Sequence, residues 1–210
     1  MPDTAEKNIS SFHFAIIVLA AGASIRLGRP KQLLMYKNKT LLRHILDIAK
    51  KVNTQPVVAI LGANIDLIAK EIADDKNIYT ITNENWNEGI ASSIRAGLKA
   101  LQQIAPACDG AIFLVCDQPY ITSSLLHDMI KLQQHSGKPI VACSYSDTIG
   151  TPVLFHKTLF HELLTLKGDA GAKKIIKKHT GSVATIPFPK GQIDIDTQTD
   201  YDALKKMLEL

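Results

Sequence analysis

Patterns that mark several common protein classes are scarce in this 210-residue chain. Its three cysteines, Cys108, Cys116 and Cys143, form no CxxC pair, which argues against a zinc site or a disulfide framework and favours reduced, buried thiols. The first apolar run, residues 14–21, is too short to cross a membrane, and it lacks the basic flank and cleavage site of a signal peptide. We therefore expect a cytoplasmic protein that binds no membrane.

Strong charge of either sign is also missing. The net charge is +4, and the basic residues are spread along the chain apart from KKIIKK at residues 173–178. This balance does not indicate a nucleic-acid partner. The spacing of KKIIKK favours a solvated helix face with Ile175 and Ile176 turned inward, and attraction of an anionic substrate is the alternative. The histidines show no spacing typical of metal ligands, so none is assigned a catalytic role.

Length and composition are those of an ordinary globular unit, with 46% hydrophobic and 21% charged residues. One core can grow to about 250 residues before chains usually divide. The polar segment MPDTAEKNISSF has no apolar anchor. We expect a flexible N-terminal tail over residues 1–12 and a single domain over residues 13–210.

Apolar runs alternate with helical patterns, which predicts an α/β fold, a three-layer α-β-α sandwich around a mostly parallel sheet. Amphipathic helices are expected over residues 41–49 and 90–101, and Thr40 and Thr122 are expected to be helix N-caps. Ligands of such sheets bind outside the carboxyl ends of the strands, so functional residues are expected there. The expected strands are residues 14–20, 56–61, 78–82, 111–116, 139–143, 152–156 and 183–187.

The run FAIIVLAAGASIRLGRPKQLL, residues 14–34, sets an apolar strand against a loop that ends in a lysine. Gly22 is expected to let the backbone turn without a Cβ penalty, so that loop N–H groups face phosphate oxygens. Arg26 and Lys31 add positive charge. The run contains neither GxxxxGK[ST] nor GxGxxG. It predicts a nucleoside triphosphate site of another type, and a tight turn with two incidental basic residues is the alternative.

Carboxylates follow two extended segments. In AIFLVCDQPY, residues 111–120, an apolar strand runs into Asp117, whose charge needs a metal, a basic partner or a helix N-terminus. In IDIDTQTDYD, Asp194 and Asp196 face the same way if the segment is extended. The next two aspartates, Asp200 and Asp202, open the last helix, where negative charge complements the helix dipole. We therefore interpret them as structural.

The segment NENWNEGIASSIRAGL, residues 83–98, places Gly89 and Ser93 at the first turn of a helix. The missing side chain of Gly89 is expected to let a flat base approach, although serines in this position are more often caps than ligand contacts. Trp86 is expected in the core rather than as a stacking platform. Arg95 either contacts phosphate or lies on the surface.

The string LAAGASIRLGRPK resembles the LAAGxSxRxGxxK signature of the MobA-like nucleotidyltransferases, in particular the molybdenum cofactor cytidylyltransferase type. Five further motifs follow in the order of that family. They are the block at residues 83–98, CDQP at 116–119, GTPVLF at 150–155, GDAGAKK at 168–174 and the late Asp-Thr at 196–197. The resemblance implies a Rossmann-like nucleotidyltransferase fold. It also implies Mg²⁺-dependent transfer of CMP from CTP to a molybdopterin-type molybdenum cofactor, giving molybdopterin cytosine dinucleotide and pyrophosphate.

The resemblance also implies roles for individual residues. Lys31 and Arg26 would be catalytic, and Asp117 and Asp196 would bind Mg²⁺. Lys173 stands where the family has arginine, a change that bears on acceptor contacts because lysine is only a point charge. The implied nucleotide-binding residues are Leu19, Ala20, Ala21, Gly22, Ala23, Ser24, Gly89 and Ser93. The implied acceptor-binding residues are Gly150, Pro152, Gly168, Asp169, Gly171 and Lys173.

LAAG, rather than LAGG, accompanies CTP in the family, and the methyl group of Ala21 is expected to narrow the pocket toward a pyrimidine.

Two alternatives to this function stay open. A cytidylyltransferase for a sugar phosphate or methylerythritol phosphate shares the PKQ string but lacks GDAGAK. A non-catalytic carrier of molybdenum cofactor would not need Lys31, Asp117 and Asp196. A molybdenum hydroxylase or its maturation factor is the protein partner that the resemblance suggests.

Overall fold

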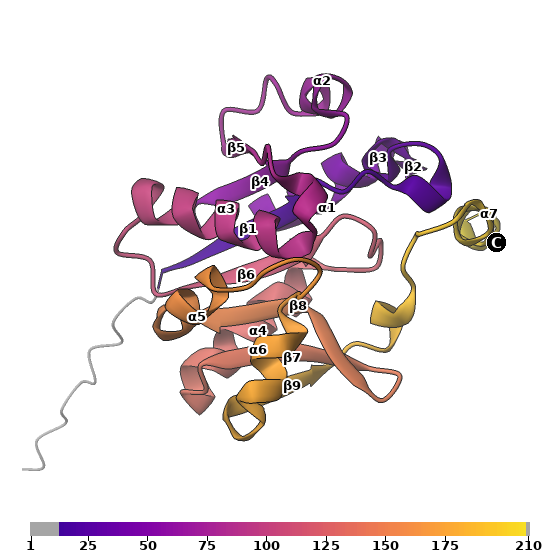
Figure 1. Cartoon of the computed structure of the whole chain (residues 1–210). Coiled ribbons are helices and arrows are strands. Elements are labelled where there is room, and N and C mark those ends of the chain that lie inside the picture. Colours follow the sequence, from indigo (N-terminus) through magenta and orange to yellow (C-terminus); the bar gives the residue numbers. More distant parts are fainter. Residues whose placement is uncertain (1–12, 209–210) are drawn as a thin grey trace, which may run out of the picture.

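The computed structural model describes residues 13–208, so the tail expected over residues 1–12 lies outside the described residues. Its centre is a seven-stranded sheet with helices on both faces (Figure 1). The strands, in their order across the sheet, are β5 (Ile78–Thr82), β4 (Val57–Leu61), β1 (Phe14–Ala20), β6 (Gly110–Val115), β8 (Thr148–His156), β7 (Ile140–Tyr145) and β9 (Val183–Pro187).

The three expected layers are present because strand residues alternate between two apolar cores. In β1, Ile16 and Val18 belong to one buried cluster, whereas Ile17 and Leu19 belong to the other. The first core is covered by α1 (Leu41–Lys50), α2 (Ile65–Ile68) and α4 (Ser123–Ser136). The second is covered by α3 (Ile90–Ile104), α5 (Phe160–Leu164) and α6 (Lys173–Lys178).

Local signals in the sequence identify the helix starts correctly. Thr40 Oγ1 accepts a hydrogen bond from the Arg43 N–H, and Thr122 Oγ1 accepts one from the Leu125 N–H, each at 3.2 Å. In α6, Ile175 and Ile176 are buried while the lysines around them are exposed, which confirms the solvated-face interpretation. The three cysteines are buried free thiols. No helix within residues 13–208 has the length and apolar character needed to cross a membrane.

A small hairpin after the first loop was not expected from the sequence. Strands β2 (Met35–Tyr36) and β3 (Lys39–Thr40) pair in an antiparallel arrangement beside the last helix, α7 (Gln198–Leu208) (Figure 1). The Tyr201 hydroxyl donates to the Met35 carbonyl at 3.0 Å, and Tyr36 and Leu204 share a buried cluster with Tyr201. The end of the chain therefore supports the segment that follows the first loop.

Strand β8 runs antiparallel to both of its neighbours, while the other pairs of the seven-stranded sheet are parallel. A two-residue turn, Ser146–Asp147, joins it to β7, and both residues have positive φ, 44° and 57°. The ladder between β6 and β8 ends at the pair Phe113 and Val153. Because Pro152 has no N–H to donate, the pairing cannot continue, and the sheet opens beside the carboxyl end of β6.

Candidate functional site

The loop after β1 turns at residues other than the expected one. Positive φ values occur at Ser24 (56°) and Gly28 (73°), whereas Gly22 has no such φ and a Cβ there would meet no atom within 4 Å. The expectation that Gly22 is needed for the turn is therefore wrong. A side chain at Gly22 would instead project into the open space that the loop borders.

Gln32, which was not singled out from the sequence, fixes the start of the loop through two hydrogen bonds. It is buried, and its Nε2 donates to the carbonyls of Ala20 at 2.8 Å and Gly22 at 2.9 Å. Ser24 Oγ accepts from the Lys31 N–H at 3.0 Å. Within residues 13–208, no hydrogen bond is donated by the N–H groups of residues 22–24. These donors are therefore available to a ligand.

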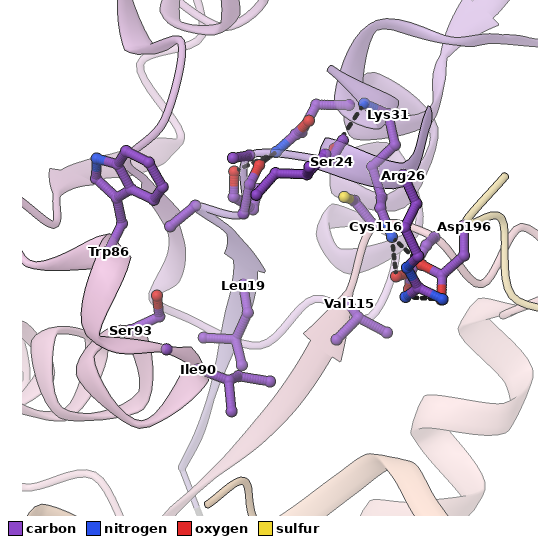
Figure 2. Close-up of a pocket in the computed structure, with 18 of the residues that line it drawn as sticks. Leu19, Ser24, Arg26, Lys31, Trp86, Ile90, Ser93, Val115, Cys116 and Asp196 are labelled. Atoms are coloured by element: carbon purple, nitrogen blue, oxygen red, sulfur yellow. Dashed lines mark hydrogen bonds and ion pairs between the residues drawn. The ribbon is translucent and has the colours of Figure 1, made fainter. Parts of the chain in front are cut away.

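Lys31 joins the two carboxylates that the sequence suggested as a pair. Its Nζ donates to Asp117 Oδ2 at 2.8 Å. It also donates to Asp196 Oδ1 at 2.5 Å, and Arg26 Nη2 donates to Asp196 Oδ2 at 2.6 Å (Figure 2). Asp117 lies just after β6, and Asp196 reaches it because the buried Ile195 donates its N–H to the Asp117 carbonyl at 3.0 Å. Four charged groups from three segments thus form one balanced cluster.

This cluster shifts the pKa values of its members. Burial alone would lower the pKa of Lys31, but Asp117 and Asp196 outweigh it and raise that pKa above its ordinary value. Burial would raise the pKa of Asp196, but Lys31 and Arg26 outweigh it and lower the value. Because its pKa is raised, Lys31 stays charged at neutral pH. Although Asp194 is exposed as a residue, desolvation of its carboxyl and the charge of Asp117 raise its pKa to about 6.

The alternatives for the late aspartates and for Asp117 are resolved by their contacts. Asp117 pairs with Lys31 and does not cap α4, which Thr122 caps, so the capping alternative is wrong. Asp200 Oδ2 accepts from the Thr197 N–H at 2.8 Å and from the Asp196 N–H at 3.2 Å. It is structural, as expected, because it holds the backbone of the Asp196 segment.

A cavity of about 430 Å³ lies beside the loop, at the carboxyl ends of β1 and β6. Figure 2 shows Lys31, Arg26 and Asp196 at one side of it and Trp86, Ile90 and Ser93 at the other. Of the residues suggested by the sequence, those that line it are Leu19, Ala20, Ala21, Gly22, Ala23, Ser24, Arg26, Lys31, Gly89, Ser93, Asp117, Asp169 and Asp196. Lining residues that were missed include Ile25, Gln32, Asn87, Ile90, Val115 and Cys116.

Trp86 and Gly89 have contacts that the sequence did not suggest. Trp86 is 37% exposed and lines the cavity, so the expectation that it lies in the core is wrong. A Cβ at Gly89, where φ is +112°, would lie 2.4 Å from Asp169 Oδ1 and 2.6 Å from the Gly168 carbonyl. Gly89 therefore makes room for the loop at residues 168–169. It also lines the cavity, and the approach of a flat base to it stays a prediction.

The start of α3 is held by a buried amide that received no role from the sequence. Asn83 Nδ2 donates to Ser92 Oγ at 2.8 Å and to Ser93 Oγ at 3.0 Å, and Ser92 Oγ donates to the Gly89 carbonyl. Both serines thus have structural partners, and Ser93 also faces the cavity. Arg95 pairs with Glu88 and with the Leu166 carbonyl, so its contacts are with the protein itself.

A family model described as the MobA-like NTP transferase domain matches residues 16–183. The chain belongs to this family. It is 28% identical over 203 residues to nicotine blue oxidoreductase of Paenarthrobacter nicotinovorans, covering 92% of this chain and 94% of that protein. It is 24% identical over 203 residues to purine catabolism protein PucB of Bacillus subtilis, covering 91% and 96%.

Two solved structures have a fold similar to that of this chain. Rv0371c of Mycobacterium tuberculosis has a TM-score of 0.79 at 30% identity, covering 96% of this chain and 100% of that chain. A complex of Rv0371c with manganese has a TM-score of 0.74 at 28% identity, covering 93% and 98%. The fold of this MobA-like protein is thus the expected Rossmann-like α/β nucleotidyltransferase fold, and the manganese complex is consistent with divalent metal use in the family.

The motifs that resemble the acceptor site of MobA-like proteins lie mostly outside the lining of the cavity. Of these residues only Asp169 is among the cavity-lining residues of the described chain. Gly150 and Pro152 lie where β8 leaves β6, and the position of a Cβ on Gly150 is 3.6 Å from Lys173 Cε. Gly168, at φ +60°, accepts from the Ala91 N–H, and Gly171 packs against Ile90. The structure brings these residues near one another without assigning them a ligand.

The donor set near Lys31 fits a magnesium ion of the kind that MobA-like proteins would use with a nucleotide. Within residues 13–208 there is no cluster of three or more His, Cys, Asp or Glu side chains suited to a metal. Mg²⁺ is commonly held by one or two carboxylates together with substrate phosphates and water. Asp117 and Asp196 converge on one cation, Lys31 Nζ, so their oxygens already surround a positive charge.

Proposed function

We propose that this MobA-like protein transfers CMP from CTP to a molybdopterin-type molybdenum cofactor, depends on Mg²⁺ and releases pyrophosphate. The observation that carries the proposal is the Lys31 ammonium group, held between Asp117 and Asp196 at the wall of a cavity bordered by unused N–H donors. Membership of the nucleotidyltransferase family supports the reaction class. CTP and the cofactor are the finer part of the proposal.

Nucleotidyl transfer requires little covalent chemistry from the protein. An oxygen of the acceptor phosphate attacks the α-phosphorus of the nucleotide, the bond to the β-phosphate oxygen breaks, and pyrophosphate leaves with the negative charge. The N–H groups of residues 22–24 would bind phosphate oxygens and fix their orientation. Lys31 and Arg26 would stabilise the charge that develops on the α-phosphate and on the departing pyrophosphate. Their present partners, Asp117 and Asp196, keep both cations at the site beforehand.

Asp117 and Asp196 would hold Mg²⁺, which when bound neutralises phosphate charge and favours departure of pyrophosphate. These two carboxylates can only serve in this way if Lys31 finds another anionic partner. The phosphates of the nucleotide supply that partner. The three side chains are thus expected to act on one substrate group and not independently.

The side of the cavity opposite Lys31 suits the base and sugar of the nucleotide. Ala21 and Trp86 line the cavity, and their Cβ atoms pack closely against Gly62: a Cβ on Gly62 would lie 2.9 Å from Ala21 Cβ and 2.6 Å from Trp86 Cβ. Because Gly62 leaves the Ala21 methyl group no room to move away from the cavity, this methyl group would limit the space for a purine. Leu19, Ala20, Gly89 and Ser93 would complete the nucleotide site.

The acceptor would lie at the edge formed by Gly150, Pro152, the loop at residues 168–171 and Lys173. This edge adjoins the carboxyl end of β6, which carries Asp117, so an acceptor phosphate bound there could reach the nucleotide. Asp169 borders both regions. A molybdenum hydroxylase or its maturation factor is the proposed recipient of the product, and the cytoplasm is the proposed location.

The test measures pyrophosphate release with Mg²⁺, purified molybdenum cofactor and CTP, GTP or ATP in parallel. Asp117→Asn should abolish release. Asp109→Asn is a matched control, because Asp109 precedes β6 at its other end and also pairs with a lysine, Lys157, at 2.8 Å. We expect CTP-selective release that only Asp117→Asn removes.

Other outcomes assign other functions. Release with a sugar phosphate or methylerythritol phosphate in place of the cofactor would change the acceptor. Cofactor binding without release would indicate a carrier. Because one similar protein is named nicotine blue oxidoreductase, a parallel arm measures oxidoreductase activity toward nicotine blue, and activity there without pyrophosphate release would overturn the proposal.

A further inference from the structure

Gln118 follows Asp117 directly and is 2% exposed, and its Nε2 donates to the Gly191 carbonyl and the Tyr145 hydroxyl rather than to the carboxylate of Asp196. We propose that Gln118 is a positioning residue, which holds the segment at residues 191–196 against the end of β6 and thereby sets the affinity of the Asp117–Asp196 pair for a divalent cation. The inference rests on the proposed function, because it concerns the metal that this function requires.

Gln118 links the segment just after β6 to the late segment. Its Nε2 donates to the Gly191 carbonyl at 2.8 Å, and four residues later the Ile195 N–H donates to the Asp117 carbonyl at 3.0 Å. Between Pro189–Gln192 and α7 the segment has no regular secondary structure of its own. The two hydrogen bonds therefore fix both ends of the stretch that delivers Asp196.

Tyr145 closes over this cross-link from β7. Its hydroxyl lies 3.5 Å from Gln118 Nε2, and its ring packs edge-on against Phe188. A Cβ on Gly191 would lie 2.6 Å from Tyr145 Cδ1, and one on Gly150 would lie 2.5 Å from the Tyr145 hydroxyl. Both glycines are therefore needed for the tyrosine to reach its place, which gives Gly150 a role independent of any acceptor.

The remaining amide atom of Gln118 indicates that stability alone does not explain the residue. Its Oε1 is buried without a hydrogen-bond partner in the described part of the chain, an arrangement that costs free energy. An apolar side chain of the same length would avoid that cost but would lose the bond to Gly191. Gln118 thus keeps its Nε2 donor to Gly191 although its Oε1 acceptor is left unsatisfied.

Residues that orient metal ligands without touching the metal typically change affinity by about 10- to 100-fold when they are replaced. Gln118→Met keeps the length of the side chain and removes its hydrogen bonds. Gln133→Met is a matched control, because Gln133 is also buried with an Oε1 that has no hydrogen-bond partner in the described part of the chain. Gln133 lies about 15 Å along α4 from Ser123, the first residue of that helix, and therefore far from the end of α4 that follows Gln118.

The experiment measures Mn²⁺ binding by electron paramagnetic resonance in the presence of CTP, with urea unfolding of each variant. We expect Gln118→Met to weaken Mn²⁺ binding at least about tenfold, and Gln133→Met to leave it at the wild-type value. The apparent KM for Mg²⁺ in pyrophosphate release should rise by the same factor. If Gln118→Met does not fold, Gln118→Asn replaces it, because its shorter amide cannot reach Gly191.

The outcomes separate this inference from the proposed function. If the wild-type protein binds Mn²⁺ with CTP but the Gln118 variants bind it equally well, the positioning role is wrong and the proposed function stands. If the wild-type protein binds no Mn²⁺ with CTP, the proposed function is wrong, and the positioning role of Gln118, which rests on it, is wrong as well. Weaker binding in both the Gln118 and Gln133 variants would show a general loss of structure and would overturn the specific role.

Discussion

Replacing Lys31 with methionine removes the cation that Asp117 and Asp196 share while keeping most of the apolar stem. The side chain of Lys31 is 15% exposed, and those of Asp117 and Asp196 are 21% and 31% exposed. Breaking a buried ion pair costs about 3–5 kcal/mol, and an exposed pair contributes less than about 1 kcal/mol. The partial burial of this cluster places the expected loss of unfolding free energy at about 2 kcal/mol.

The loss should depend on pH with a definite sign. Burial would raise the pKa of Asp196, but Lys31 and Arg26 outweigh it, so the folded value lies below the ordinary one. The ionised carboxylate therefore stabilises the fold above about pH 4, and this contribution disappears as pH falls through the lowered pKa. Without Lys31 that contribution shrinks, so the difference in unfolding free energy between wild type and Lys31→Met should be largest at neutral pH. It should begin to narrow near about pH 4 and vanish only below the lowered pKa of Asp196.

Urea unfolding at pH 7 and at pH 3.5 measures both effects, and pyrophosphate release measures the loss of catalysis, expected at about 10²- to 10³-fold in kcat. Lys157→Met is the matched control, because Lys157 pairs with Asp109 but is 49% exposed, and it should cost less than about 1 kcal/mol. Equal destabilisation by the two variants, or a gap that stays constant between the two pH values, would refute the reasoning.

Three further changes test other parts of the site. Ala21→Gly should raise the rate with GTP relative to CTP in pyrophosphate release, and an unchanged ratio would contradict the steric account of base choice. Gly89→Ala should destabilise the protein in urea by at least about 2 kcal/mol more than Gly137→Ala, because both have positive φ but only Gly89 would clash. Addition of CTP with Mg²⁺ should change the fluorescence of Trp86, the only tryptophan in the chain, and no change at saturation would place the base elsewhere.

The strands and the main helices could be predicted because their signals are local. An uninterrupted apolar run such as residues 14–20 is typical of a strand covered on both faces, and Thr40 and Thr122 cap the helices that follow them. The need of Asp117 for a metal, a basic partner or a helix N-terminus could also be predicted, because a carboxylate at the end of a buried strand needs a partner. That Lys31 is this partner is visible only in the structure.

What could not be predicted depends on contacts between distant segments. Gly89 is constrained by residues 168–169, and the Cβ atoms of Trp86 and Ala21 both lie close to Gly62, far from either in the sequence. Gln32 and Gln118 act through side-chain hydrogen bonds to backbone carbonyls of other segments, for which the sequence carries no periodic signal. The direction of β8 is equally hidden, since an apolar strand has the same pattern whichever way it runs.

The reversed direction of β8 has a consequence for how this part of the protein can vary. Parallel strands give a site only the residues that come after them, whereas β8 gives the residues at its start, and β7 and β8 form one ribbon closed by the turn at Ser146–Asp147. Insertions at that turn would lengthen the ribbon without altering its register with β6 or moving Asp117. The wall proposed for the acceptor can therefore change in size while the chemistry beside it stays fixed.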